Sequence, residues 1–432
     1  MSVPRVPADA RTALPSQRWI DRWLAACRDL AELERSNPMT DAVIDEIDGR
    51  MIRIGDRWLA DFASCNYLGF DLDREIIAAV PPALERWGTH PSWSRLLGSP
   101  VLYNEIETRL TELVGAEDTL VLPTITLIHT SVIPVLAGDG TIYVDSRSHK
   151  TIYEGSQIAA AHGATVKRFR HEDVDDLARL LAENGSAPRL ICVDGVNSMT
   201  GNAADVRTLA RLAREYDALL YVDDAHGFGV IGERRDGELS PFGSRGNSVV
   251  RHMDETYDHV VLVAGLSNSY SSLAAFIACP SELKRLLKTA APPYLYSGPS
   301  PIASLATTLA GLDVNEERGD EIRAGLWRKT AAVLDSLDRL GAHTPNTSGF
   351  PIIEVPLGHG EDIDAVGRFL FDNGIYVTLA AYPLVPRNEV GFRIQVTAAN
   401  TNAEIENLVD VLGKLANGFD LQPSRGRSER AA

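Results

Sequence analysis

The sequence is poor in several features that mark whole classes of protein. Its four cysteines lie far apart, with no C-x-x-C pair and no histidine spacing typical of a zinc site, so we expect reduced, structural thiols and no metal. No stretch approaches the roughly 20 uninterrupted apolar residues of a membrane span, and the first thirty residues lack the apolar core of a signal peptide. We therefore expect a cytoplasmic protein. No internal repeat is visible.

Positive charge is also scarce. The formal net charge is −17, whereas phosphate backbones and anionic lipids attract clustered lysine and arginine. Nucleic acid and membrane surfaces are therefore not expected as partners. The length of 432 residues exceeds the size of about 250 to 300 residues at which a single core stops growing, so two packed units are predicted.

The order of helical and strand patterns favours an α/β fold. Residues 17–35 repeat apolar positions at three- and four-residue steps, which predicts an amphipathic helix. Residues 49–64 predict two short strands around a turn at Gly55 and Asp56. From about residue 75 to 280, seven short apolar strands alternate with helices, which implies parallel βαβ units with helices on both faces of a sheet.

These patterns divide the chain into four expected parts. Residues 1–60 form a helical arm with short strands, and residues 61–313 form a large domain around the mostly parallel, seven-stranded sheet. Residues 314–420 form a smaller α+β domain, and residues 421–432 form a disordered tail. Ligands of such sheets gather at the carboxyl ends of the strands, so we expect the functional site there.

The segment LLYVDDAHGFGVIG carries the clearest chemical signal. Asp223 ends an apolar strand, and His226 follows three residues later. A carboxylate at a strand tip can keep a pyridinium nitrogen protonated, and a nearby histidine can meet the phenolic oxygen of the same ring. The plain alternative is a strand end whose aspartate caps the next turn, and the segment alone fits that interpretation equally well.

This segment resembles VDEAHS-G-VLG or VDDAHGTGVIG of the α-oxoamine synthases, a pyridoxal-phosphate family that joins an acyl thioester to an amino acid. Its members include 8-amino-7-oxononanoate synthase and serine palmitoyltransferase. Other motifs follow in the family's order over residues 45–415. CNYLGF from Cys65 resembles its N-Y-L-G-F motif, DSRSHKTIYEG its D-x-x-x-H-A-S-x-x-x-G motif, and DGVNSMTGNAADV its EGVFSMDGDIAPL motif. The resemblance implies the fold type I architecture and a dimer.

The resemblance also implies roles for individual residues. His149 would stack on the pyridine ring, Ser198 and His226 would approach the phenolic oxygen, and Asp223 would hold the ring nitrogen. Arg393 would receive the substrate carboxylate, a task that suits a bidentate guanidinium. Considered one at a time, these residues also fit ordinary structural roles. His149 fits a core histidine, Ser198 fits a turn former, and Arg393 fits a surface ion-pair partner.

Further positions relate to the phosphate and the substrate. Thr124 and Ile125 stand where the family cradles the phosphate at a helix start, whose backbone N–H groups bind anions. Gly265 replaces the family's phosphate-contacting threonine, although Ser267 can still donate a hydrogen bond. Cys65 replaces an asparagine or tyrosine on the substrate side.

One departure changes the expected chemistry. The family's lysine lies in a motif similar to GT-F-SK-A-x-G-S, which corresponds here to AGLSNSYSS, so that Asn268 falls on the lysine. An amide cannot form a Schiff base with pyridoxal phosphate, and it cannot shuttle a proton as a lysine does. We therefore expect pyridoxal phosphate to be bound noncovalently or to have been lost.

Three functions remain open. The first is an acyltransferase that joins an acyl thioester of coenzyme A or acyl carrier protein to a small amine or amino acid, with His149 or His226 as the general base. The second is an inactive subunit or regulator that pairs with a lysine-bearing homologue, so the chain would form either a homodimer or a heterodimer. The third is a drifted paralogue that only folds. The retained acid-base residues favour the acyltransferase.

Overall fold

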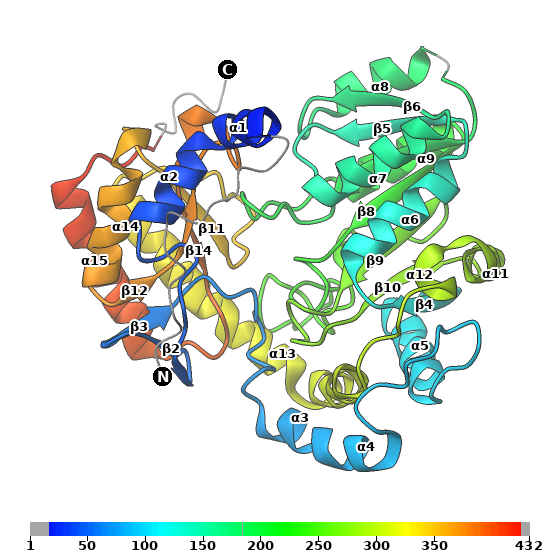
Figure 1. Cartoon of the computed structure of the whole chain (residues 1–432), viewed down its shortest axis with the longest axis horizontal. Coiled ribbons are helices and arrows are strands. Elements are labelled where there is room, and N and C mark those ends of the chain that lie inside the picture. The colour runs from blue at the N-terminus through cyan, green and yellow to red at the C-terminus, as the bar shows by residue number, and fades with distance from the viewer. Residues whose placement is uncertain (1–16, 184, 425–432) are drawn as a thin grey trace.

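A seven-stranded sheet forms the centre of the larger half of the molecule (Figure 1). The computed structural model describes residues 17–183 and 185–424. In spatial order the strands are β4 (Asp118–Leu122), β10 (Ala275–Cys279), β9 (Val260–Gly265), β8 (Ala218–Asp223), β7 (Arg189–Asp194), β5 (Thr141–Asp145) and β6 (Thr165–Phe169). Of these seven, β10 alone is antiparallel to its neighbours, so the predicted mostly parallel sheet is confirmed.

Helices cover both faces of this sheet because successive residues of a strand point to opposite sides. In β8, Leu220 and Val222 enter one apolar cluster, whereas Tyr221 enters another. The first cluster includes residues of α5 (Leu102–Val114), α8 (Val174–Ala182) and α9 (Val206–Glu215). The second includes residues of α6 (Ile125–Ala137), α7 (Lys150–Ala161), α11 (Ser281–Ala290) and α12 (Pro292–Leu295).

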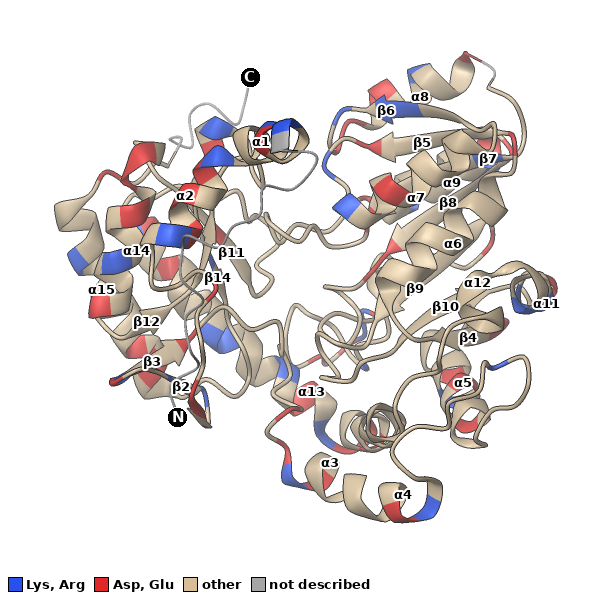
Figure 2. Cartoon of the chain, viewed as in Figure 1, with Lys and Arg blue, Asp and Glu red and all other residues tan. Residues whose placement is uncertain are grey.

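Charged residues are sparse along the middle of the sheet and frequent on the outer helices (Figure 2). Helix α6 carries no lysine, arginine, aspartate or glutamate, and neither does β9. In β8 the only charged residue is Asp223, the last residue of the strand. A charge placed there, beside apolar elements, is costly unless it has partners.

The smaller half contains two further sheets. One is antiparallel, in the order β11 (Ile352–Pro356), β14 (Gly391–Gln395) and β13 (Thr378–Ala380). The other has the order β1 (Glu46–Asp48), β2 (Met51–Ile54), β3 (Arg57–Asp61) and β12 (Ile375–Tyr376). Helices α14 (Ile363–Asp372) and α15 (Asn402–Gly418) pack beside them, and α15 begins with a capping box at Thr401.

The chain is divided differently from the expected scheme in three places. Helix α13 (Ile302–Arg339) runs through the expected boundary after residue 313, packing against α5 in one half and α15 in the other. Strand β3 pairs in parallel with β12, so the N-terminal strands share a sheet with the C-terminal part. The disorder predicted from Leu421 is wrong for Leu421–Ser424, since Leu421 and Pro423 form β-bridges. The rest of that tail lies outside the described residues.

The remaining elements are short. The helix expected at 17–35 is interrupted near Cys27 and forms α1 (Gln17–Ala26) and α2 (Arg28–Ser36), while residues 1–16 of the predicted arm lie outside the described residues. The other helices are α3 (Arg74–Ala78), α4 (Val80–Trp87), α10 (Val249–His252) and the 3-10 helices η2 (Gly360–Asp362) and η3 (Arg387–Glu389). Within the described ranges no helix combines the length and the apolarity needed to cross a membrane.

Candidate active site

Four neighbouring parallel strands bring the predicted site residues to one edge of the sheet. His149 precedes α7 just after β5, Ser198 follows β7, Asp223 ends β8, and Asn268 follows β9. Parallel strands end at the same edge, so positions that are distant in the sequence become neighbours. The predicted location at the carboxyl ends of the strands therefore agrees with the arrangement of these residues.

Asp223 is a buried carboxylate with defined partners. Its Oδ1 accepts a hydrogen bond from the backbone N–H of Ala225 at 3.0 Å, and its Oδ2 lies 3.0 Å from Nε2 of His129. Burial by itself would raise the pKa of Asp223, but His129 and the Ala225 amide together hold it below its usual value. The strand tip therefore carries a negative charge that can hold a protonated ring nitrogen.

His129 is a site residue that the sequence did not reveal. It is fully buried on α6, and its Nδ1 lies 2.8 Å from the hydroxyl of Tyr221. An N–H at Nε2 of this imidazole donates to Asp223, which fixes the orientation of that carboxylate. The only signal in the sequence was a single histidine in an otherwise apolar helix, TLIHTSV, and such a histidine is more often a core residue.

His226 is held by Tyr67, a second residue that the sequence analysis did not single out. The Tyr67 hydroxyl lies 2.8 Å from Nδ1 of His226 and donates weakly to Gln395 at 3.3 Å. Loss of contact with water and the charge of Arg393 lower the pKa of His226 to about 3. The imidazole is therefore neutral at physiological pH, and Tyr67 leaves its Nε2 available to a ligand.

This shift in the pKa of His226 predicts a pH dependence of stability. Between its ordinary pKa of 6.5 and about 3, the unfolded chain binds a proton that the folded chain excludes, so the unfolding free energy falls as the pH falls through this window. In a His226→Gln variant, chemical unfolding measured from pH 7 to 4.5 should show a shallower loss of stability than in the wild type. His359→Gln, at an exposed position, serves as the control. Parallel curves for the wild type and His226→Gln would contradict the shift.

His149 caps the start of α7. Its backbone N–H donates to Oδ1 of Asp194 at 2.9 Å, and its Nδ1 lies 2.7 Å from the Thr151 hydroxyl. His149 is exposed overall, but partial loss of contact with water lowers the pKa of its imidazole. Stacking by His149 remains a prediction.

Ser198 and Arg393 meet through the backbone. One Nη atom of Arg393 donates to the carbonyl oxygen of Ser198 at 2.6 Å, and the same atom lies 3.6 Å from the sulfur of Met199. The structure thus joins β14 of the smaller half to the loop after β7. The roles predicted for the Ser198 hydroxyl and for Arg393 in carboxylate binding stay predictions.

Asn268 points at the backbone between the two acid-base residues. Its Nδ2 donates to the carbonyl oxygen of Ala225 at 3.0 Å, and Ala225 lies between Asp223 and His226 in the chain. Ser267, its neighbour, is exposed. Lys150 lies near the site in sequence, but its Nζ pairs with Glu154 on the surface of α7.

Cys65 lies against the same network. Its thiol donates to Oε1 of Gln395 at 2.7 Å, and burial raises the pKa of the thiol. Cys65 therefore stays protonated and acts as a polar lining residue rather than a nucleophile. Its position next to Tyr67 and Gln395 is consistent with the predicted location on the substrate side.

The start of α6 follows β4 at this edge of the sheet. Thr124 is the N-cap, and its hydroxyl accepts a hydrogen bond from the N–H of Leu127 at 3.3 Å. The first N–H groups of a helix have no partner within the helix, so Ile125 begins a turn that can bind an anion. The phosphate role of Thr124 and Ile125 remains a prediction.

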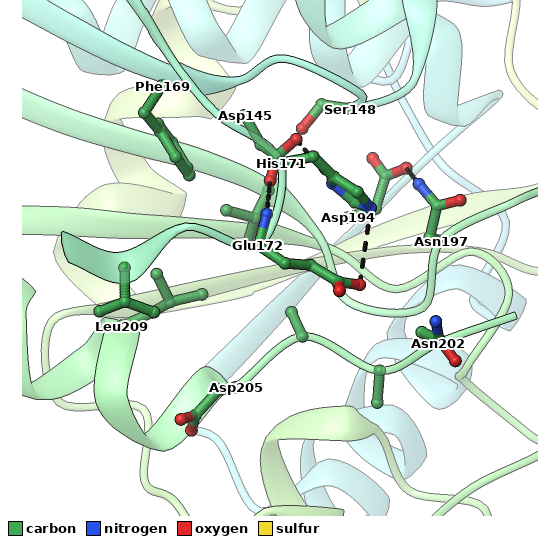
Figure 3. Close-up of a pocket in the computed structure, with 14 residues that line it drawn as sticks. Asp145, Ser148, Phe169, His171, Glu172, Asp194, Asn197, Asn202, Asp205 and Leu209 are labelled. Carbon is green, nitrogen blue, oxygen red and sulfur yellow. Dashed lines mark hydrogen bonds and ion pairs between the residues drawn. The ribbon is translucent and has the colours of Figure 1, made fainter. Parts of the chain in front are cut away.

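A cavity of about 280 Å³ lies behind this edge, beside α8 and α9 (Figure 3). Nδ1 of His171 lies 2.9 Å from Asp145 in its wall, and Glu172 lies next to the same imidazole. Asp194 lines the cavity, and its Oδ1 also accepts the hydrogen bond from the His149 backbone. None of the predicted site residues is among the residues that line it.

Comparisons with known proteins identify the relatives of this chain. The model of the family described as aminotransferase class I and II matches residues 59–412. The 8-amino-7-oxononanoate synthase of Symbiobacterium thermophilum is 30% identical over 379 residues, which cover 87% of this chain and 91% of that protein. Serine palmitoyltransferase of Sphingobacterium spiritivorum is 32% identical over 380 residues, which cover 87% of this chain and 89% of that enzyme.

Solved structures show the same fold. Serine palmitoyltransferase from S. paucimobilis, in a lysine-to-alanine variant with a bound pyridoxal phosphate–myriocin aldimine, superposes with a TM-score of 0.84 at 24% identity, covering 94% of this chain and 99% of that chain. For 8-amino-7-oxononanoate synthase from Francisella tularensis the TM-score is 0.70 at 18% identity, with 83% and 97% covered. The chain therefore belongs to the aminotransferase class I and II family, in the group formed by the α-oxoamine synthases.

Proposed function

We propose that this protein is an acyltransferase of the α-oxoamine synthase type that works without a lysine bound to its cofactor. Its substrates would be an acyl thioester, carried by coenzyme A or acyl carrier protein, and a small amine or amino acid. Pyridoxal phosphate would be held only by noncovalent contacts. The single observation that carries the proposal is the position of Asn268 beside two retained acid-base residues.

The hydrogen bond from Asn268 to the Ala225 carbonyl supports placing this amide where the relatives' lysine would lie. It holds the end of the side chain against the backbone of Ala225, which lies between Asp223 and His226 in the chain, just after β8. The two lysines nearest to Asn268 in sequence, Lys284 and Lys288, contact Glu107 and the ring of Tyr294 instead of this position. An amide there can donate and accept hydrogen bonds but cannot bond covalently to an aldehyde.

The residues present fit pyridoxal phosphate held without a covalent bond. Asp223, kept ionised by His129, would hold the ring nitrogen, and the start of α6 at Thr124 and Ile125 would hold the phosphate with help from Ser267. His149 would cover the ring face. When bound, the cofactor would supply an electron sink for the amine substrate.

The acid-base step falls to the neutral histidines. His226 keeps Nε2 free while Tyr67 orients the ring, and His149 is the second candidate for the general base. The charge of Arg393 contributes to the low pKa of His226. A substrate carboxylate bound by Arg393 would cancel that charge, so His226 would become more basic when the substrate arrives.

The wild-type protein should bind pyridoxal phosphate reversibly. We expect cofactor added to the purified chain to be removed by gel filtration and not to be fixed by borohydride, because reduction attaches the cofactor to the chain only where a lysine of the chain has formed a Schiff base with it. Intact mass after borohydride treatment checks this. A fixed cofactor would contradict the assignment of Asn268, and turnover of an acyl thioester by the purified chain alone would support the acyltransferase.

The second candidate, an inactive subunit paired with a lysine-bearing homologue, needs a surface that contacts another chain. Apolar side chains stand exposed on neighbouring segments near residues 90–101 and 291–300, which His90 ties together through a 2.9 Å contact with Pro299. Leu97 is 79% exposed and Tyr296 is 82% exposed. Such a surface fits contact with a second chain. Homodimers active in the assay above would exclude the inactive-subunit proposal.

A further inference from the structure

A buried carboxylate without a partner lies on the smaller half of the site. Glu354, in β11, is 1% exposed, and its Oε1 has no hydrogen-bond partner. No ion pair within 4.0 Å is found for it among the described residues. An unpaired buried carboxylate is costly, and burial together with the charge of Glu389 raises the pKa of Glu354 to about 7. The position therefore calls for a hydrogen-bond donor that the chain does not provide.

The register of the small sheet places Glu354 beside the predicted substrate arginine. Glu354 is paired with Arg393 across β11 and β14, so both side chains project from the same face. Gln395 projects from that face as well, two residues along β14, and it contacts Cys65 and Tyr67. The face that carries Glu354 is thus the face turned toward the candidate active site.

Arg393, in contrast, has a buried hydrogen-bond donor without an acceptor. Its Nε is buried without an acceptor, although one Nη atom donates to the Ser198 carbonyl. The two neighbours do not satisfy each other, because no Arg393–Glu354 ion pair forms within 4.0 Å. Next to them, Arg147 and Glu389 form an ion pair with contacts of 2.6 and 2.7 Å. Arg147 is therefore already paired and does not neutralise Glu354.

The charges of this cluster decide which ligand would complete it. A substrate carboxylate would form an ion pair with Arg393. Glu354 would then remain buried without a partner, and it would carry a negative charge unless it is protonated. A positively charged group on the same substrate would form an ion pair with Glu354. Hydrogen bonds between charged groups are stronger than those between neutral groups. A substrate with one carboxylate and a side-chain ammonium therefore satisfies both residues at once.

We propose that Glu354 makes the site specific for a short diamino acid as the amine substrate. The carboxylate of this substrate would bind Arg393, and its side-chain ammonium would bind Glu354. This inference rests on the proposed acyltransferase function and specifies its amine substrate. Glu354 acts here by direct contact with the substrate. The reacting α-amino group is left free for the acid-base residues on the large sheet.

Binding of two amino acids with the same carbon skeleton tests the proposal. L-2,4-diaminobutyrate carries the extra ammonium, and L-2-aminobutyrate does not. In calorimetry with the full-length chain and pyridoxal phosphate, we expect the wild type to bind the diamino acid about 10- to 100-fold more tightly, as for hydrogen bonds between charged groups. Glu354→Gln should abolish this preference while the affinity for L-2-aminobutyrate is kept or improved.

Matched variants separate the possible outcomes. Glu389→Gln removes a carboxylate of the same cluster that already has a partner, so it should keep the preference. Thermal unfolding of Glu354→Gln should match or exceed the wild type, because an unpaired acid is removed, and Glu354→Ala provides a second test of the preference. Equal binding of both amino acids by the wild type, or an unchanged preference in both Glu354 variants, overturns this inference alone. Equal affinity for L-homoserine and the diamino acid also overturns it. Failure to bind any amino acid overturns the proposed function as well.

Discussion

Replacing Asn268 by lysine should turn reversible cofactor binding into covalent attachment. The Asn268 side chain already reaches the carbonyl of Ala225, beside Asp223 and His226, and a lysine from the same backbone position would place its amine in this pocket. Limited contact with water lowers the pKa of an amine and makes it a better nucleophile. Borohydride followed by intact-mass measurement should show stoichiometric labelling of Asn268→Lys and none of the wild type.

A nearby exposed residue supplies the control for this substitution. Leu273 is 54% exposed in the same connection between β9 and β10, so a Leu273→Lys variant adds an amine to this loop without directing it at Ala225. We expect this variant to remain unlabelled. Equal labelling of both variants would mean that any local amine reacts, and an unlabelled Asn268→Lys protein that still binds the cofactor would refute the assignment of this position.

Asp223→Asn should weaken the binding of pyridoxal phosphate by about 10- to 100-fold, the usual worth of a hydrogen bond to a charged group. The variant keeps the shape of the side chain but loses the charge that His129 and the Ala225 amide hold in place. Equilibrium dialysis measures the affinity directly. Because the cofactor has no covalent attachment in this proposal, the loss should appear fully in the dissociation constant.

A second aspartate at the same edge of the sheet tests whether the effect is specific. Asp205 caps α9 through the N–H of Thr208, and asparagine is an equally good cap, so Asp205→Asn should fold and bind cofactor as the wild type does. If Asp223→Asn binds the cofactor as tightly as this control, the carboxylate does not hold the ring nitrogen. Thermal unfolding of both variants excludes a general loss of structure.

Local sequence patterns were sufficient to predict the strands of the large sheet, and they placed several candidate residues at its carboxyl edge. Apolar strands ending in Asp223 and Gly265 were visible as short runs, and the carboxyl-end rule put Asp223, His226 and Asn268 at one edge. His129 was missed because nothing near it in sequence distinguishes a site residue from a core residue, and Tyr67 was noted only as part of the CNYLGF motif. Only packing of α6 on β8 brings His129 within 3.0 Å of Asp223.

The division of the chain illustrates the same limit. The periodicity of apolar residues identifies a helix, but it does not show where one domain ends and the next begins. The expected domain boundary after residue 313 therefore fell inside α13. The pairing of β3 with β12 joins segments more than three hundred residues apart, and no local pattern encodes such a partner. The ordered part of the tail likewise depends on the bridges that Leu421 and Pro423 make with distant residues.

The sequence by itself determined the α/β class and the family, and it led to the expectation that Asn268 stands at the lysine position, because these rest on residue types and their order along the chain. Tertiary structure alone decided which groups lack partners. Glu354 looked like one acidic residue in an apolar strand until the register with β14 set it beside Arg393, buried and unpaired. Charge in a protein acts through distance and solvation, and neither quantity is defined before the chain is folded.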